Sequence, residues 1–305
     1  MVLYIPQRTG PYVAHKGRSA WLEYHRSKGK INKTIEYTDI YKKILDLFKD
    51  LRKPINELSV MHGFECKNHI RITRGMYIKS FKSRDDWKNA IVDKEIVKKY
   101  RNHMNYNKYK GQRFTNNYKN YAICFLSLKK YTYSTSDVEC LRWATETKNY
   151  TVFKIHPQTV KTNPHRIKLF LEICKNYNYL SEYTVLLYDN YDVSDLINKS
   201  NFVYSSESSV IVQALISGKP CFLTSNTPFL DIVPTYSVIP NDYVPIAIDE
   251  DAINKFITWY YYVVCIDMNK ENWKDLIKKR YDMYQKNMTD HQALTWENAC
   301  KNGLQ

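Results

Sequence analysis

The stretch NFVYSSESSVIVQALISGKP, residues 201–220, decides how the fold of this chain is interpreted. Its pattern predicts a short buried strand at 202–204, a serine-rich turn and a helix over 210–217. Gly218 and Pro220 end that helix, because glycine tolerates the left-handed backbone that follows a helix and proline cannot continue one. A strand that leads through serines into a helix N-terminus offers unsatisfied backbone N–H groups and hydroxyls to an anion. We therefore expect a phosphate or diphosphate to bind here.

Two interpretations of the serines remain open on this stretch alone. Ser206 and Ser208 are also typical N-cap residues, which begin many helices without binding any ligand. A second stretch favours the anion site, because YTVFKIHP at 150–157 predicts a strand that ends in Lys154, His156 and Pro157. Ligands of open parallel sheets bind at the carboxyl ends of strands, and both stretches contain such an end.

Residues 121–305 alternate between strand-like and helix-like patterns. The expected strands are 121–127, 150–155, 183–188, 201–204 and 220–224. The expected helices are 137–147, 164–176, 193–198 with Asp192 as its cap, 210–217, 250–266 and 271–287. This alternation is typical of a parallel, doubly wound sheet, so the predicted fold class is α/β.

Residues 1–120 are less regular. We expect a strand at 2–6, a helix at 37–50 and a strand at 58–61 that ends in His62 and Gly63. Residues 102–119 have almost no aliphatic side chains, and we interpret them as a mobile basic loop between two domains, 1–120 and 121–305. A plain polar linker is the alternative. The last helix is expected to pack back across the interface between the domains.

Excess positive charge is confined to the first part of the chain. Of the 46 Lys and Arg residues, 27 lie in residues 1–120 with 11 Asp and Glu, a net charge of +16. The other 19 share residues 121–305 with 20 acidic residues, a net charge of −1. A solvated basic surface is one explanation, but a compositional bias would raise Lys throughout, so a polyanion is favoured, with DNA as the first candidate. The expected contacts are Arg8, Lys16, Arg18, Arg71, Arg74, Lys108, Lys110 and Arg113.

Cysteine and hydropathy patterns bear on several classes of protein. The seven cysteines are an odd number without a C-x-x-C pair, which argues against a zinc site and fits a reducing compartment. Cys124, Cys221 and Cys265 lie in apolar runs and are expected in the core. No apolar run reaches the roughly 18 residues that span a bilayer, and the first residues lack the layout of a signal peptide. We therefore expect a cytoplasmic protein.

FKIHP at 153–157 and SSVIVQALISGKP at 208–220 resemble motifs in the donor domain of GT-B glycosyltransferases. The resemblance is to the capsule-polysaccharide Kdo-transferase-like and CDP-glycerol glycerophosphotransferase families and covers residues 121–230. It implies two Rossmann-like, doubly wound domains that face a central cleft. It also places the phosphates of a UDP- or CMP-linked sugar at the motif residues. The implied donor-binding residues are Lys154, His156, Ser206, Ser208, Ser209 and Gln213.

The resemblance also implies catalytic residues in the first part of the chain. SVMHGFE at 59–65 resembles the strand-end His-Gly motif of these families, so His62 is the expected general base and Glu65 the second candidate. An acceptor hydroxyl must lose its proton as it attacks the anomeric carbon, and histidine suits this near neutral pH. A structural hydrogen bond is the alternative role of His62. We expect no metal and no cofactor besides the nucleotide sugar, since His156 and the helix take the charge of the leaving phosphate.

Two classes of function are compatible with these residues. The first is a glycosyltransferase, with a 5-hydroxymethylated pyrimidine in phage DNA as the preferred acceptor, a base that would leave the duplex to reach the donor. A surface polysaccharide or lipid-linked glycan is the rival acceptor. The second class is a non-catalytic nucleic-acid-binding protein with a transferase-like fold, which leaves His62, His156 and the serines without a task. The oligomeric state is left open.

Overall fold

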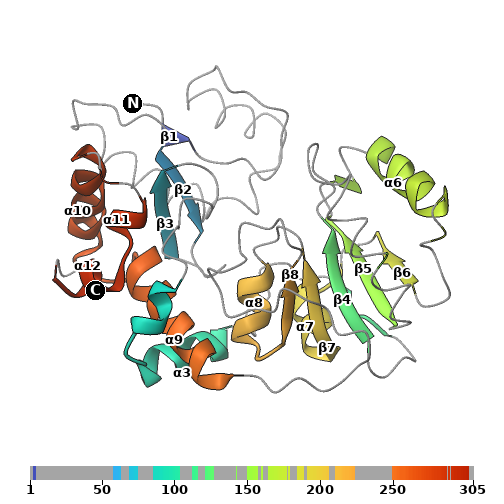
Figure 1. The fold of residues 1–305 in the computed structure, drawn as a ribbon, viewed down its shortest axis with the longest axis horizontal. Helices are drawn as coiled ribbons and strands as arrows, with labels where there is room; N and C mark the ends of the chain where they lie inside the picture. Colours follow the sequence, from blue (N-terminus) through green and yellow to red (C-terminus); the bar gives the residue numbers. More distant parts are fainter. Residues whose placement is uncertain are drawn as a thin grey trace.

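The fold is given by a computed structural model, which describes two sheets and the helices around them (Figure 1). The strand order of the first sheet is β1-β2-β3-β9, and that of the second sheet is β6-β5-β4-β7-β8. The described residues are 3–4, 58–62, 69–74, 85–103, 112–115, 121–126, 142, 150–156, 159–160, 164–176, 178, 184–188, 191–205, 210–223, 249–286, 288 and 290–301.

The second sheet is parallel throughout. Its strands are β4 (Tyr121–Leu126), β5 (Thr151–Ile155), β6 (Thr184–Leu187), β7 (Ser200–Ser205) and β8 (Cys221–Leu223). β4 lies in the centre, with β5 and β6 on one side and β7 and β8 on the other. This is the doubly wound order that the alternating sequence pattern predicts, and it confirms the α/β fold class.

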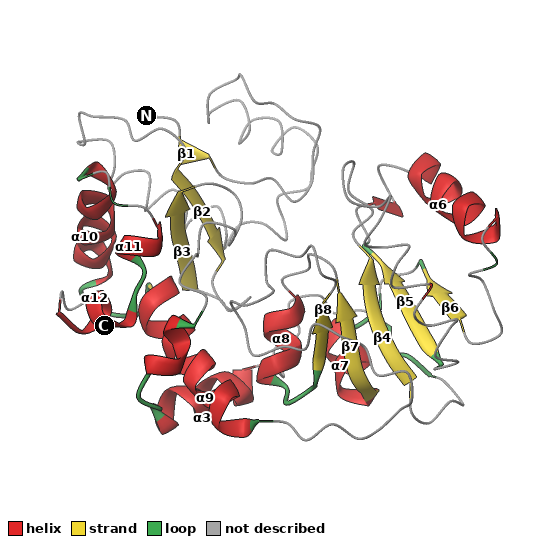
Figure 2. Cartoon of the chain, viewed as in Figure 1, coloured by secondary structure: helices red, strands yellow, loops and turns green. Residues whose placement is uncertain are grey.

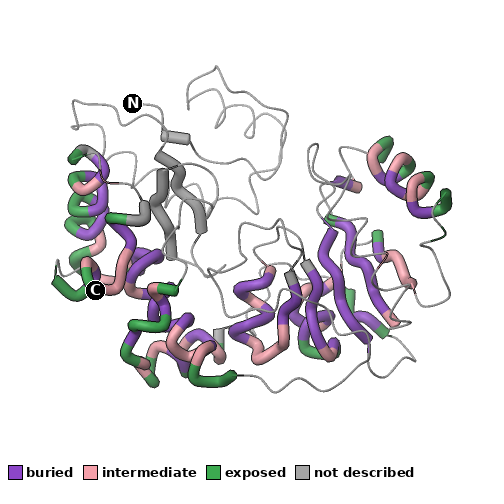
Figure 3. Tube along the Cα trace, viewed as in Figure 1, coloured by how far each residue is buried: buried purple, intermediate pink, exposed green. Residues whose placement is uncertain are grey.

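Helices cover both faces of the second sheet. α6 (Pro164–Asn176) buries Phe170 and Cys174 against the face that carries Phe153 and Tyr204. α7 (Val193–Lys199) and α8 (Val210–Ile216) pack on the opposite face, which carries Phe125. All residues of β4 and β5 are therefore buried, as Figure 3 shows, and the continuous apolar run of β4 reflects burial on two faces.

The ends of α7 and α8 follow the signals in the sequence. The Asp192 carboxylate accepts hydrogen bonds from the backbone N–H groups of Ser194 and Asp195, so it caps α7 as predicted. α8 ends at Gly218, whose φ of 71° lies in the left-handed region. The N–H groups of Gly218 and Lys219 return to the carbonyls of Leu215 and Ala214, which completes a Schellman motif. The prediction of a helix that stops at Gly218 is confirmed.

The first sheet is mixed in its described residues. β1 (Leu3–Tyr4) runs parallel to β2 (Leu58–His62), whereas β3 (His69–Arg74) is antiparallel to β2 and to β9 (Cys265–Asp267). Only residues 63–68 join β2 to β3, and a parallel crossover needs about a dozen residues or more. The antiparallel pairing follows from this short connection, and it departs from the predicted doubly wound N-terminal sheet.

The C-terminal part of the chain returns to the first sheet. The helix predicted over 250–266 is shorter: α9 (Glu250–Trp259) passes into a π-helical turn, Tyr260–Val264, and Cys265 then begins β9. The pairing of β9 with β3 takes these last residues out of the helix. α10 (Trp273–Gln285), α11 (Asp290–Ala293) and α12 (Trp296–Lys301) follow and lie on the same side of the molecule as the first sheet (Figure 2).

One hydrophobic core connects the two sheets. The helical turn η3 (Asp86–Asn89) and α3 (Lys94–His103) pack against α9, and α9 also contacts α8. The same buried cluster includes Ile211 of α8, Ile257 of α9 and Ile277 of α10. The predicted core cysteines Cys124, Cys221 and Cys265 are all buried. Among the described helices, none has the length and hydropathy to cross a membrane.

Candidate functional site

The carboxyl ends of β4, β5 and β7 meet at one edge of the second sheet. Phe125 of β4 pairs with Lys154 of β5 on one side and with Ser205 of β7 on the other. The helices after β5 and β7 pack on opposite faces, so the direction of winding reverses between β4 and β7. Open α/β sheets bind their ligands outside the carboxyl ends of the strands at such a reversal.

His156 lies at this edge. It directly follows the last residue of β5 and is exposed. Its backbone N–H donates to the carbonyl of Leu126, the last residue of β4, over 3.0 Å. The hydrogen bond to β4 therefore fixes the backbone that carries the imidazole. A side chain that can donate, accept or carry a proton near neutral pH is suited to an anionic group at this place.

Lys154 lies inside the sheet, in contrast to His156. Its residue is 3% exposed, and its ammonium donates to the carbonyl of Ile155 over 2.8 Å. The sequence predicts Lys154 as a ligand of the donor phosphate. The structure places this residue in the buried interior of the sheet, beside the carbonyl of Ile155, and its role toward a donor stays a prediction.

The serines that open α8 lie outside the described residues. Ser206, Ser208 and Ser209 fall in 206–209, between the end of β7 and the start of α8. Gln213, expected to bind the donor, is half-buried in α8, and its side-chain amide donates to the hydroxyl of Ser194 in α7 over 2.9 Å. This bond ties α8 to α7.

The predicted catalytic and acceptor-binding residues are only partly described. His62 is the last residue of β2, and Arg71 and Arg74 lie in β3. These three belong to the first sheet, whereas His156 belongs to the second. Arg113 is exposed. Glu65, Arg8, Lys16, Arg18, Lys108 and Lys110 lie outside the described residues.

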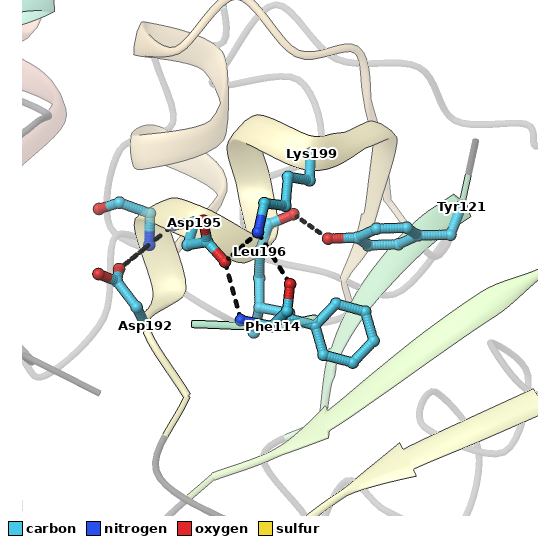
Figure 4. Close-up of polar contacts among 7 residues, drawn as sticks. Phe114, Tyr121, Asp192, Asp195, Leu196 and Lys199 are labelled. Carbon is cyan, nitrogen blue, oxygen red and sulfur yellow. Dashed lines mark hydrogen bonds and ion pairs between the residues drawn. The ribbon is translucent and has the colours of Figure 1, made fainter. Parts of the chain in front are cut away.

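Residues 112–115 are anchored on α7, although the sequence predicts a mobile connection there. The backbone N–H of Phe114 donates to the Asp195 carboxylate over 2.9 Å, and its carbonyl accepts from the Lys199 ammonium over 2.8 Å. Asp195 and Lys199 also pair with each other over 2.9 Å, so these three residues close a ring of contacts (Figure 4). Gln112 adds a parallel bridge to Tyr191.

The anchored segment lies at the start of β4. The Phe114 ring packs edge-on against Tyr121, the first residue of β4, and the Tyr121 hydroxyl donates to the carbonyl of Leu196 in α7. Burial, with the charge of Asp195, raises the pKa of Tyr121 above its usual value, so the hydroxyl stays protonated. Arg113 is exposed between Gln112 and Phe114 of this anchored segment. The i,i+4 spacing of Asp195 and Lys199 was the signal in the sequence, although it did not reveal the partner segment.

The described part of the chain holds no metal-binding cluster, and the thiols of Cys174 and Cys221 are buried. No group of three His, Cys, Asp or Glu side chains there could hold an ion. Burial raises the pKa of the Cys174 thiol to about 12 and also raises the pKa of Cys221. Both cysteines therefore act as small core residues.

Comparison with known proteins gives a limited likeness. No protein-family model and no curated protein matches the sequence. Among solved structures, the β Kdo 2,4 transferase of Thermosulfurimonas dismutans KpsC is 12% identical, with a TM-score of 0.44 over 73% of this chain and 77% of that chain. The β Kdo 2,7 transferase of the same protein is 15% identical, with a TM-score of 0.44 over 78% and 82%. AviGT4, a glycosyltransferase involved in avilamycin A biosynthesis, is 12% identical, with a TM-score of 0.35 over 55% and 52%. Likeness at this level carries no conclusion about substrate or reaction.

Proposed function

We propose that this protein is a glycosyltransferase that takes a sugar from a UDP- or CMP-linked donor. The observation that carries the proposal is the exposed His156 at the carboxyl end of β5, beside the reversal of winding between β4 and β7. This is where an open α/β sheet binds a nucleotide. FKIHP includes the end of β5, and SSVIVQALISGKP follows β7; these two strands lie on either side of β4. Both motifs resemble those of GT-B donor domains.

In this proposal the two parts of the chain hold different substrates. His156, with Ser206, Ser208 and Ser209, neutralises the phosphate that leaves with the nucleotide. The acceptor oxygen forms a bond to the anomeric carbon while the bond from that carbon to the phosphate oxygen breaks. His62 takes the proton of the acceptor hydroxyl, with Glu65 as the second candidate. No metal takes part, because His156 and the backbone amides after β7 stabilise the developing charge.

The donor assignment is tested by substituting His156. His156→Ala is expected to lower turnover of a labelled UDP- or CMP-sugar panel by about a hundredfold or more, since groups that stabilise a leaving oxyanion contribute at this level. His165→Ala is the matched control, because His165 is exposed in the first turn of α6. Equal turnover in both variants contradicts the proposed role of His156.

For the acceptor we propose a hydroxyl on DNA, in line with the net charge of +16 on residues 1–120. Binding to duplex DNA that contains 5-hydroxymethylcytosine should weaken steeply with salt, because each contacted phosphate releases counterions. Arg113→Gln should flatten the log–log slope by about one unit, while Lys175→Gln on α6 should not. A flat slope in the unaltered protein favours a neutral glycan acceptor. DNA binding without transfer to any acceptor favours a non-catalytic protein.

A further inference from the structure

Lys154 carries a charge into an apolar part of the second sheet. Its residue is 3% exposed, and its partners across the ladder are Phe125 of β4 and Leu187 of β6. Val152, two residues earlier and on the same face, belongs to the hydrophobic core. A buried ammonium is costly unless hydrogen bonds compensate its lost hydration. The group that accepts from it therefore indicates what the side chain does.

One group that accepts from the Lys154 ammonium is the carbonyl of Ile155, over 2.8 Å. In a trans peptide the carbonyl of one residue and the N–H of the next point in opposite directions. Since the His156 N–H points to β4 and bonds Leu126, the Ile155 carbonyl points towards β6. The described pairing of β5 with β6 ends at Lys154 and Leu187, one residue before this carbonyl.

The Lys154 ammonium thus donates to a carbonyl that lies one residue beyond the described β5–β6 ladder. The peptide that joins Ile155 to His156 is held on both sides, by Leu126 through its N–H and by Lys154 through its carbonyl. Hydrogen bonds from a charged donor are stronger than neutral ones. The backbone of His156 is consequently fixed two residues beyond the end of the described β5–β6 ladder.

We propose that Lys154 is a positioning residue that orients His156, and that it is not a ligand of the donor phosphate. The part of this proposal that concerns the donor rests on the proposed function. The part that concerns the backbone does not, since it applies to the protein without any ligand.

The ligand-free part is tested by amide hydrogen exchange. Lys154→Met should increase the exchange rate of the His156 N–H by about tenfold or more, because a charged hydrogen bond next to it is lost. Lys154→Arg, which keeps a charged donor, should restore most of the protection. Lys219→Met is the matched control: the Lys219 ammonium also bonds backbone carbonyls, those of Asn198 and Ser200, but at the amino end of the sheet. If Lys154→Met does not fold, Lys154→Gln takes its place. Unchanged exchange at His156 in the folded variant overturns the proposal.

The donor part is tested by a double-mutant cycle with UDP and CMP as probes. If Lys154 acts through His156, Lys154→Met as a single substitution weakens nucleotide binding. Added to His156→Ala, it causes no further loss of binding. If Lys154 contacts the phosphate itself, the two losses add, and the proposal is overturned. The two failures are distinguishable. Absence of binding by the unaltered protein defeats the proposed function, whereas the exchange of the His156 amide still decides whether Lys154 positions it.

Discussion

At the scale of one residue, the carboxylate of Asp93 joins the start of α3 to Tyr262, which lies far along the chain. Its Oδ1 accepts from the N–H groups of Glu95 and Ile96 at the start of α3, and its Oδ2 accepts from the Tyr262 hydroxyl over 2.6 Å. Burial alone would raise the pKa of this carboxyl, but the bonds from Tyr262 and the two amides outweigh it and lower the pKa. A carboxyl with a lowered pKa stabilises the fold above its unfolded value of about 3.9 and loses this contribution as pH falls.

The predicted consequence is a pH-dependent effect of Asp93→Asn. Asparagine retains the capping geometry but removes the charge that accepts from Tyr262. At pH 7 the variant should unfold at lower urea concentration, by about 1–2 kcal/mol in free energy of unfolding. The difference should shrink as pH falls below about 4, the unfolded pKa, and should vanish only once the native carboxyl, whose pKa is lower, also takes up a proton.

Asp251→Asn is the control for this measurement, because Asp251 forms an exposed i,i+4 pair with Lys255 on α9. Exposed pairs of this kind contribute little, so its unfolding curve should follow that of the unaltered protein at both pH values. A difference between Asp93→Asn and the unaltered protein that stays constant with pH would rule out the role of the Asp93 charge.

At the scale of elements, the anchoring of residues 112–115 on α7 should contribute measurably to stability. Asp195→Ala removes the acceptor of the Phe114 N–H and leaves the Lys199 ammonium without its carboxylate. We expect a loss of about 1–3 kcal/mol in urea unfolding, together with faster exchange of the Phe114 amide. Glu297→Ala is the matched control, since Glu297 forms an exposed i,i+4 pair with Lys301 and accepts from no distant segment among the described residues. Equal stability of the two variants contradicts the anchor.

Most of the described strands and helices around the second sheet could be predicted from the sequence. The strands of the second sheet and α6, α7 and α8 were predictable within one or two residues, because local periodicity and end signals such as Gly218 and Asp192 determine them. β9 and residues 112–115 were not, because their conformation depends on partners far along the chain: β3 for β9 and α7 for residues 112–115. Tertiary pairing overrides local helical pattern at Cys265 for this reason.

The candidate site was predictable as a location but not in its details. The pattern YTVFKIHP indicated a strand that ends in Lys154, His156 and Pro157, and His156 lies at the carboxyl edge, where it is exposed. Nothing in the sequence separated the roles of Lys154 and His156, since alternation along a strand does not show which side chain ends beneath the edge. The assignment of the first sheet as doubly wound failed in its described residues because a six-residue connection forces an antiparallel pair.

At the scale of the whole molecule, the continuous core raises the question of whether the two predicted domains unfold separately. Ile211 of α8 contributes to the core over the second sheet, and Ile277 belongs to α10, which contacts β3 and β9 of the first. Both side chains are fully buried, and one cluster contains them. A core shared in this way couples the two sheets, so we expect a single cooperative transition in calorimetry, with equal calorimetric and van't Hoff enthalpies.

Ile211→Ala and Ile277→Ala test this coupling directly. Each variant creates a cavity that should cost about 2–5 kcal/mol, because neighbours relax only partly around a deleted side chain. If the core unfolds as a unit, each substitution lowers the midpoint of the same transition, followed by calorimetry and by circular dichroism. Two transitions, with Ile211→Ala moving only one and Ile277→Ala only the other, would show that α9 joins two independently stable parts. In that case the boundary predicted near residue 120 would mark a thermodynamic division of the chain, with β9 and the C-terminal helices belonging to the first part.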